Sequence, residues 1–360
     1  MPNEPIKVRA LRGVTAADFE KLIYRNGFDS KYQERVDYLR KESKINTLRK
    51  REECTSIAKS IYSSRLDTSP LFILGHWRSG TTLLHYILAQ DARFGFVTRH
   101  HAFNPYSALP PLRDWIYGAT SRGVDNVIID VGAPAEDEFP IAARSLSSPY
   151  IGFVFPRHAN YYDRFITLRE VTSEELSRWT RALEWTLKKA TYFFPSRRLL
   201  LKSPPHTGRI RTLLKLFPDA KFIHIHRNPA EVIRSIYALN STFSPANYLE
   251  NPTGDDIIET IIRRYNMIFD AYYEDIALIP RDRLISIGLD EFLSDPIHSL
   301  NKIYETLRLP PFAECEKQVR SYLAMIFSYN KTNHPDVPAI MRREIFRRIA
   351  KNVDRLGYTL

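Results

Sequence analysis

Residues 71–84, LFILGHWRSGTTLL, have the composition of a strand that leads into an anion-binding loop and a helix. The apolar run stops at Gly75, crosses a short polar turn and continues as a helical pattern from Gly80. The first backbone N–H groups of a helix have no partner within it and lie at the positive end of its dipole, so an oxyanion binds there readily. Further donors in this segment are supplied by Arg78, Ser79, Thr81 and Thr82.

The spacing of Gly75 and Gly80 matches the first half of the nucleotide-triphosphatase motif G-x-x-x-x-G-K-[ST]. Position 81, however, is Thr where that motif requires Lys. Triphosphatases use this Lys on the outer phosphates and the next hydroxyl on Mg²⁺, so its absence argues against metal-assisted phosphoryl transfer. Arg78 supplies a positive charge within the loop instead.

The elements around this loop alternate between strands and helices. Strands are predicted at residues 71–74, 94–98, 199–201, 221–226 and 283–287, and helical patterns separate them. This alternation indicates an α/β fold with a central parallel sheet flanked by helices. Because ligands bind at the carboxyl ends of such strands, the loop, Lys202 and Arg227 are predicted to meet at one edge.

Three regions are distinguished along the chain. Residues 1–66 form a helical N-terminal extension, in which Thr15 is a candidate helix cap, and residues 67–360 form the main domain. Within that domain residues 100–170 are irregular and rich in Pro, Gly and Tyr, which favours a binding role for them. Regular helix is expected again from Thr172, where Thr-Ser-Glu-Glu forms a capping-box pattern.

Two separated motifs resemble those of the sulfotransferases that use 3'-phosphoadenosine-5'-phosphosulfate (PAPS). W-R-S-G-T-T-L, residues 77–83, is similar to that family's 5'-phosphosulfate loop, and R-N-P-x-x-V-x-x-S, residues 227–235, is similar to its 3'-phosphate motif. LLLKSPPHTGRI, residues 199–210, resembles the bacterial branch of the family. The motifs stand in the family's order, and the resemblance covers about residues 70–240.

The resemblance implies a P-loop NTPase-like fold and in-line transfer of a sulfuryl group from PAPS to a hydroxyl or amine, leaving 3'-phosphoadenosine-5'-phosphate (PAP). It implies that PAPS is bound at its 5' end by Arg78, Ser79, Gly80, Thr81 and Thr82, and at its 3'-phosphate by Arg227 and Ser235. Lys202 lies where tyrosylprotein sulfotransferases have a catalytic lysine. Lys202 and Arg78 are therefore expected to neutralise the leaving phosphate, with no metal required.

A hydroxyl acceptor needs a general base within hydrogen-bond reach. P-A-E-D-E-F, residues 134–139, resembles a stretch of the bacterial family members, and Glu136 is the preferred base, with Glu138 second. The alternative interpretation is that these acids begin a helix and complement its dipole. His100 and His101 are rival bases, because they follow the second predicted strand.

The sequence departs from the family at two points. Position 83 is Leu where cytosolic members have the Trp that stacks on adenine, and the R-K-G element of their 3'-phosphate site is missing. Lys331 and Arg209 are candidate replacements for that element. His224 and His226 would share one face of a strand, but no third ligand with metal-site spacing is evident.

Composition narrows the class of partner. The net charge of +11 indicates an anionic ligand, but no nucleic-acid recognition motif accompanies it. No apolar run approaches the roughly 20 residues of a membrane helix, and two cysteines cannot form a disulfide framework, so a cytoplasmic location is expected. The sequence leaves homo-oligomerisation open.

The acceptor is expected to be a small molecule, a lipid or a carbohydrate. Aromatic side chains in the irregular region favour an apolar or ring-bearing molecule: Tyr106, Trp115, Tyr117, Tyr150, Phe153, Phe155, Tyr161 and Tyr162. Two other functions fit the residues, namely a nucleoside triphosphate-dependent kinase on the same scaffold and a non-catalytic binder of nucleotides or sulfated sugars.

Overall fold

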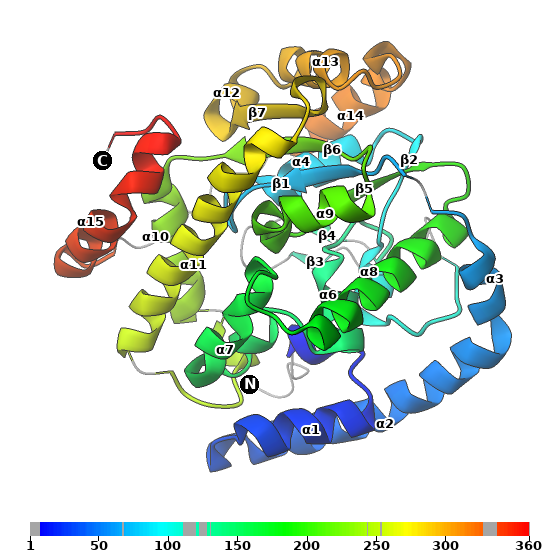
Figure 1. Ribbon diagram of the computed structural model, residues 1–360, viewed down its shortest axis with the longest axis vertical. Helices are drawn as coiled ribbons and strands as arrows, with labels where there is room; N and C mark the ends of the chain where they lie inside the picture. Colours follow the sequence, from blue (N-terminus) through cyan, green and yellow to red (C-terminus); the bar gives the residue numbers. More distant parts are fainter. Residues whose placement is uncertain are drawn as a thin grey trace.

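The computed structural model describes residues 8–66, 68–110, 120–121, 128–129, 131–242, 244–252, 254–326 and 337–359. Its central sheet is parallel and has the strand order β2–β5–β1–β6–β7 (Figure 1). The strands in that order are Phe94–Gly95, Arg198–Lys202, Leu71–Leu74, Lys221–His226 and Leu284–Gly288. The short strands β3 (Thr120–Ser121) and β4 (Ile128–Ile129) pair separately and antiparallel. The predicted α/β class is confirmed.

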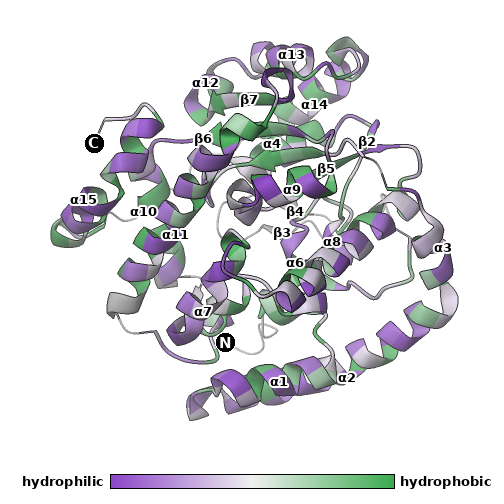
Figure 2. Cartoon of the chain, viewed as in Figure 1, coloured by the Kyte–Doolittle hydropathy of each residue, from purple (hydrophilic) through white to green (hydrophobic). Residues whose placement is uncertain are grey.

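The strands are apolar on both faces because helices cover both faces. All four residues of β1 are buried, with Phe72 and Leu74 in one core cluster and Leu71 and Ile73 in the other. Hydrophobic residues accordingly gather on the strands in Figure 2, whereas the surface helices carry many hydrophilic ones.

Among the described residues, the helices that pack on one face of the sheet include α4 (Thr81–Leu88), α12 (Leu289–Ser294), α13 (Pro296–Thr306) and α14 (Glu316–Ile326). In Figure 1, α12 and α13 are seen at the top, and α4 lies close to β1 and β6. The helices around the larger core on the other face include α6 (Glu138–Ser145), α7 (Ala159–Asp163), α8 (Ser173–Phe193), α9 (Ile210–Leu216), α10 (Pro229–Thr242), α11 (Gly254–Asp275) and α15 (Ala339–Arg355).

The N-terminal region is helical, as predicted, with α1 (Ala16–Asn26), α2 (Gln33–Ser56) and α3 (Ala58–Ser63). Phe19 and Leu22 of α1 and Val36 of α2 belong to the same core cluster as Phe72 of β1. The extension is thus packed onto the main core. Its treatment as a separate unit, residues 1–66, stays a prediction.

Of the two helix caps predicted from the sequence, the one at Thr172 is observed, whereas the hydroxyl of Thr15 does not cap its helix. Thr172 and Glu175 form the predicted capping box of α8, with both reciprocal hydrogen bonds present. Thr15 is at the N-cap of α1, but its hydroxyl donates to Asp18 instead of accepting from the helix backbone.

The strand predicted at residues 94–98 was wrong beyond Gly95. After β2 the chain leaves the sheet, and Thr98 forms an isolated bridge with Pro134. This bridge brings the acidic segment 134–139 beside the short helix α5 (Arg99–Phe103). In the described residues no helix is long and apolar enough to cross a membrane.

Buried histidines predict a loss of stability in acid. Burial lowers the pKa of His76 to about 4, and the pKa values of His85, His101 and His224 to about 3. The unfolded chain binds these protons near pH 6.5 while the folded chain does not, so acid favours unfolding. Four groups at about 1.4 kcal/mol each should lower the free energy of unfolding by up to about 5 kcal/mol per pH unit between pH 6 and 4.

Urea denaturation at a series of pH values measures this slope. His224→Gln should reduce it by about a quarter, since one of the four groups is removed. His298→Gln, at an exposed position, is the matched control and should leave the slope unchanged. A free energy of unfolding that stays constant from pH 7 to pH 5 would contradict the prediction.

Candidate active site

Two glycines allow the close packing of the loop after β1. Gly75 and Gly80 have φ values of 149° and 99°, which residues with a Cβ rarely adopt. A Cβ at Gly75 would lie 2.4 Å from the backbone oxygen of Ile225, and one at Gly80 would lie 2.7 Å from the side chain of Leu289. The loop therefore rests directly on β6 and α12, with Gly80 as the N-cap of α4.

Hydrogen bonds hold the loop in place. The backbone N–H of Gly75 donates to Oγ1 of Thr207 at 2.7 Å, and the hydroxyl of Ser79 donates to the carbonyl of His76 at 2.8 Å. Ser79 and Thr81 are nearly fully buried. The hydroxyl of Ser79, which the sequence presents as a donor to the cofactor, is thus used within the loop.

Arg78 connects the two predicted PAPS motifs. Its backbone has a φ of 70°, and its side-chain Nε donates to the hydroxyl of Ser235 at 2.8 Å. Ser235 is on α10, 157 positions further along the chain. The loop after β1 and the R-N-P-x-x-V-x-x-S segment therefore lie side by side.

Arg227 follows β6 and pairs with Glu231, which is in the first turns of α10, at 3.2 Å. Glu231 and Ser235 are four residues apart and so share one face of the helix. The guanidinium of Arg227 and the hydroxyl of Ser235 are consequently presented on the same side of α10, about one helical turn apart.

Lys202 lies between the loop and the acidic segment. It ends β5 and is paired with Ile73 of β1 in the sheet register. Its Nζ donates to Oγ1 of Thr82 at 3.2 Å and to Oε1 of Glu136 at 2.5 Å, and its side chain is buried. Two side chains that the sequence selects for catalysis are therefore in direct contact.

Glu136 also contacts the aromatic side chains beside it. Its second oxygen accepts a hydrogen bond from Tyr150, whose hydroxyl oxygen accepts one from the indole N–H of Trp77 at 3.3 Å. Burial and the charge of Glu136 raise the pKa of Tyr150 well above its usual value. Tyr150 therefore stays protonated and acts as a donor to Glu136.

Asp137, which sequence reasoning did not select, fixes the acidic segment to the end of β5. Its carboxylate accepts from Ser203 at 2.9 Å and contacts His206 at 2.5 Å, and Ser203 accepts from the backbone N–H of Glu138. Burial favours the neutral acid, but His206 and the hydrogen bonds outweigh it and lower the pKa of Asp137 to about 2. The carboxylate is ionised and positions Glu136 beside Lys202.

Glu138 and Arg209 form a buried ion pair. Both side chains are fully buried, and Nη1 of Arg209 lies 2.5 Å from Oε2 of Glu138. Oε1 of Glu138 accepts from Ser148, and Arg209 also donates to the carbonyl of Phe165. Glu138, the second candidate base, and Arg209, a candidate ligand of the 3'-phosphate, are therefore paired with each other in the protein interior.

A cavity of about 990 Å³, including its open mouth, lies beside Glu136. Its apolar wall consists of Trp77, Phe139, Tyr150, Phe153, Ile236, Leu239 and Ile261. Arg9 and Ala10 from the N-terminal region complete one side. The sequence pattern does not predict that Arg9 and Ala10 line the cavity, because their position depends on how the N-terminal extension packs against the main domain.

Two of the aromatic residues predicted to bind the acceptor line this cavity, namely Tyr150 and Phe153. Tyr106, Phe155 and Tyr162 are buried in the protein interior, and Tyr161 is at the surface. Trp115 and Tyr117 lie outside the described residues. Trp77 also lines the cavity, and its position in the loop motif next to Arg78 is the sequence signal for this placement.

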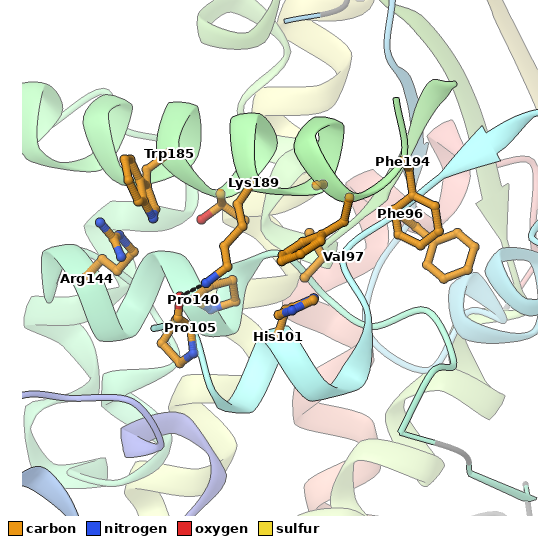
Figure 3. Close-up of a pocket in the computed structure, with 12 residues that line it drawn as sticks. Phe96, Val97, His101, Pro105, Pro140, Arg144, Trp185, Lys189 and Phe194 are labelled. Atoms are coloured by element: carbon orange, nitrogen blue, oxygen red, sulfur yellow. Dashed lines mark hydrogen bonds between the residues drawn. The ribbon is translucent and has the colours of Figure 1, made fainter. Parts of the chain in front are cut away.

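The rival bases lie elsewhere. His101 faces a smaller cavity between α5 and α8, where Lys189 donates to the carbonyl of Pro105 at 2.8 Å and to Glu53 at 2.6 Å (Figure 3). His101 bonds Thr98 and the carbonyl of Leu109, and His100 bonds Ser107. Neither histidine lines the cavity beside Glu136.

The remaining candidates are placed as follows. His224 and His226 do share one face of β6, with Ser286 and Tyr358 as hydrogen-bond partners. Within the described ranges no group of three His, Cys, Asp or Glu side chains could hold a metal ion. Leu83 packs against the core under α4, and Lys331 lies outside the described residues.

Comparison with known proteins agrees with this geometry. The model of the sulfotransferase family matches residues 70–314. The omega-hydroxy-beta-dihydromenaquinone-9 sulfotransferases Stf3 of Mycobacterium bovis and Mycobacterium tuberculosis are each 32% identical over 295 residues, which is 80% of this chain and 75% of theirs. The chain belongs to the sulfotransferase family and transfers a sulfuryl group from PAPS.

Solved structures support the fold. The sulfotransferase STF9 from Mycobacterium avium superposes with a TM-score of 0.66 at 19% identity, covering 96% of this chain and 98% of that one. STF1 from Mycobacterium tuberculosis superposes with a TM-score of 0.62 at 16% identity, covering 95% and 100%. At these identities the likeness concerns the fold alone.

Removal of the buried Glu138 should cost stability. Glu138→Gln leaves the guanidinium of Arg209 buried without its counter-charge, so we expect a loss of about 3–5 kcal/mol in the free energy of unfolding. Glu174→Gln breaks an exposed pair with Arg178 and should change it by less than about 0.5 kcal/mol. Urea denaturation compares the two variants, and equal losses would contradict the structural role of Glu138.

Proposed function

We propose that the enzyme sulfates an alcohol carried on an apolar body, with the donor bound at the β1 loop and α10 and the acceptor bound in the cavity beside Glu136. The observation that carries this proposal is the position of Lys202. Its ammonium contacts Thr82 of the loop and Glu136 of the cavity, so one cation lies between the donor and the acceptor sites.

The donor site is assigned from the strand ends. Backbone N–H groups at the start of α4, from Gly80 to Thr82, bind the 5'-phosphosulfate, since a helix N-terminus stabilises an anion there. Ser79 holds the loop closed through its bond to His76. Arg227, in the turn between β6 and α10, and Ser235, on α10, bind the 3'-phosphate.

The reaction moves one proton and one sulfuryl group. Glu136 accepts the proton of the acceptor hydroxyl while that oxygen forms a bond to sulfur. The bond from sulfur to the bridging oxygen of the 5'-phosphate breaks, and PAP leaves with the electron pair. Lys202 and Arg78 stabilise the charge that develops on this bridging oxygen.

The pairing of Lys202 with Glu136 also makes catalysis depend on the donor. While Lys202 donates to Oε1 of Glu136, this carboxylate oxygen is occupied and does not accept the proton of the acceptor. An anionic donor competes for the ammonium of Lys202 and so releases Glu136, with Tyr150 still holding the carboxylate in position. Glu136 thus becomes available as a base only when the sulfuryl donor is bound.

The cavity wall supports an apolar acceptor. Rings and aliphatic side chains make up most of its exposed surface. The relatives named above act on a hydroxylated menaquinone, as their name states. We therefore favour a lipid-like alcohol over a carbohydrate as the acceptor.

We also infer that the enzyme is cytoplasmic, because the thiol of Cys54 is exposed and free, as is usual in a reducing compartment.

The direct test is incubation with radiolabelled PAPS and a panel of apolar alcohols, phenols, sugars and amines, with labelled product and PAP both measured. Transfer to apolar alcohols above the other classes is expected. Transfer to sugars alone would overturn the acceptor assignment, and ATP turnover with Mg²⁺ would favour a kinase.

Loss of the charged groups should abolish transfer without abolishing nucleotide binding. Lys202→Ala, Arg78→Ala and Glu136→Gln should each lower kcat by about 100-fold or more, because each acts on the transition state. Lys188→Ala, which removes a lysine paired with Glu184 on α8, is the control and should keep full activity. Calorimetry with PAP verifies binding, and retained transfer in Lys202→Ala would refute its role.

The 3'-phosphate assignment has its own test. Arg227→Ala should weaken PAP binding by about 10-fold or more, whereas binding of adenosine 5'-monophosphate, which lacks the 3'-phosphate, should be unchanged. Arg234→Ala is the matched control because Arg234 also pairs with Glu231 but is outside the assigned pair. An equal loss for both nucleotides in Arg227→Ala would contradict a 3'-specific contact.

A further inference from the structure

Arg264 is a buried cation that the proposed reaction does not use. It lies on α11, is 6% exposed and lines the cavity beside Glu136. Its Nε donates to Oδ1 of Asp163 at 2.7 Å, but its Nη2 is buried and has no hydrogen-bond partner in the part of the chain that the structure describes. The guanidinium is thus only partly satisfied by Asp163, so a ligand oxygen that meets it from the cavity would be stabilising.

The local charge also favours a ligand. Asp163 is fully buried and accepts from two arginines, since Arg263 donates to its Oδ2 through Nε at 2.9 Å and Nη2 at 2.7 Å. One carboxylate therefore faces two guanidinium groups, and the cluster carries a net positive charge. Glu136, a carboxylate on the same cavity wall, is paired with Lys202 and so does not compensate this charge.

Arg264 and Glu136 both line this cavity, and aromatic side chains lie between them. The guanidinium carbon of Arg264 lies 4.3 Å from the centroid of the Phe153 ring, and that ring lies 5.3 Å from the ring of Tyr150. The hydroxyl of Tyr150 donates to Glu136. Two aromatic rings thus separate the cationic group from the proposed base.

We infer that the cavity binds a bifunctional acceptor, with its hydroxyl at Glu136 and a carbonyl or carboxylate oxygen at Arg264. An apolar body joins the two groups and packs on Phe153 and Tyr150. The assignment rests on the proposed function for the hydroxyl end only, because the bond to Arg264 needs no transfer chemistry. Arg264 acts as a residue for binding and specificity and not as a catalytic one.

Binding of matched probes tests this inference in the full-length protein with PAP present. The probes are 8-hydroxyoctanoate, 8-hydroxy-2-octanone and 1-octanol, which share the hydroxyl and the chain but differ at the far end. Calorimetry should show one or both oxygen-bearing probes binding about tenfold or more tightly than 1-octanol, and their order distinguishes carboxylate from carbonyl. No preference in the wild-type protein would overturn the inference, and this result needs no variant.

Two arginines that share one partner provide the control. Arg264→Met should remove the preference, reducing the ratio of dissociation constants to about one, whereas Arg263→Met should preserve it, because Arg263 also pairs with Asp163 but does not line the cavity. Arg264→Lys should keep part of the preference for the carboxylate. Equal behaviour of the Arg264→Met and Arg263→Met variants would overturn the inference.

Labelled transfer measured with the same probes separates the two proposals. Selective binding without any sulfuryl transfer would reject the proposed acceptor site but retain the oxygen-binding subsite at Arg264. Transfer at equal efficiency to all three probes, with no selectivity in KM, would reject the subsite and leave the sulfotransferase reaction intact.

Discussion

The arrangement of the active site depends on the register of three neighbouring parallel strands. β1 pairs with β5 on one side and β6 on the other, with Ile73 beside Lys202 and Leu74 beside His224. Because all three strands run in the same direction, their carboxyl ends lie at one edge. The positions of the loop after β1, of Lys202 and of Arg227 follow from this register, and a slip by one residue would turn Lys202 to the other face.

A network of buried polar groups holds the acidic segment against that edge. Asp137 binds Ser203 and His206, and Glu138 binds Arg209, while Glu136 alone of these three acids reaches the cavity. Such buried groups are stable because their hydrogen-bonding capacity is satisfied by partners. Three consecutive acids therefore have different roles, set by their surroundings and not by their chemical type.

The cavity beside Glu136 is assembled from distant parts of the chain. The β1 loop contributes Trp77, the irregular region contributes Tyr150 and Phe153, α11 contributes Arg264 and the N-terminal region contributes Arg9. The N-terminal extension is thus part of the cavity wall.

The amino-acid sequence by itself determined the class of fold, the strands at β1, β5 and β6, the capping box at Thr172 and the chemistry of the loop. These features depend on local patterns, namely apolar runs, glycine positions and short motifs, which are readable without knowing what lies nearby. The sequence also selected Lys202 and Glu136, but as separate candidates.

Only the tertiary structure decided that Lys202 and Glu136 touch, that Arg78 bonds Ser235, and that Glu138 and Arg209 neutralise each other in the interior. It also placed His101 in a different cavity and ended β2 after Gly95. The physical reason is that burial, hydrogen bonding and charge pairing depend on residues far apart in the chain. A local pattern shows which groups are present, but only the packed molecule determines which of them meet.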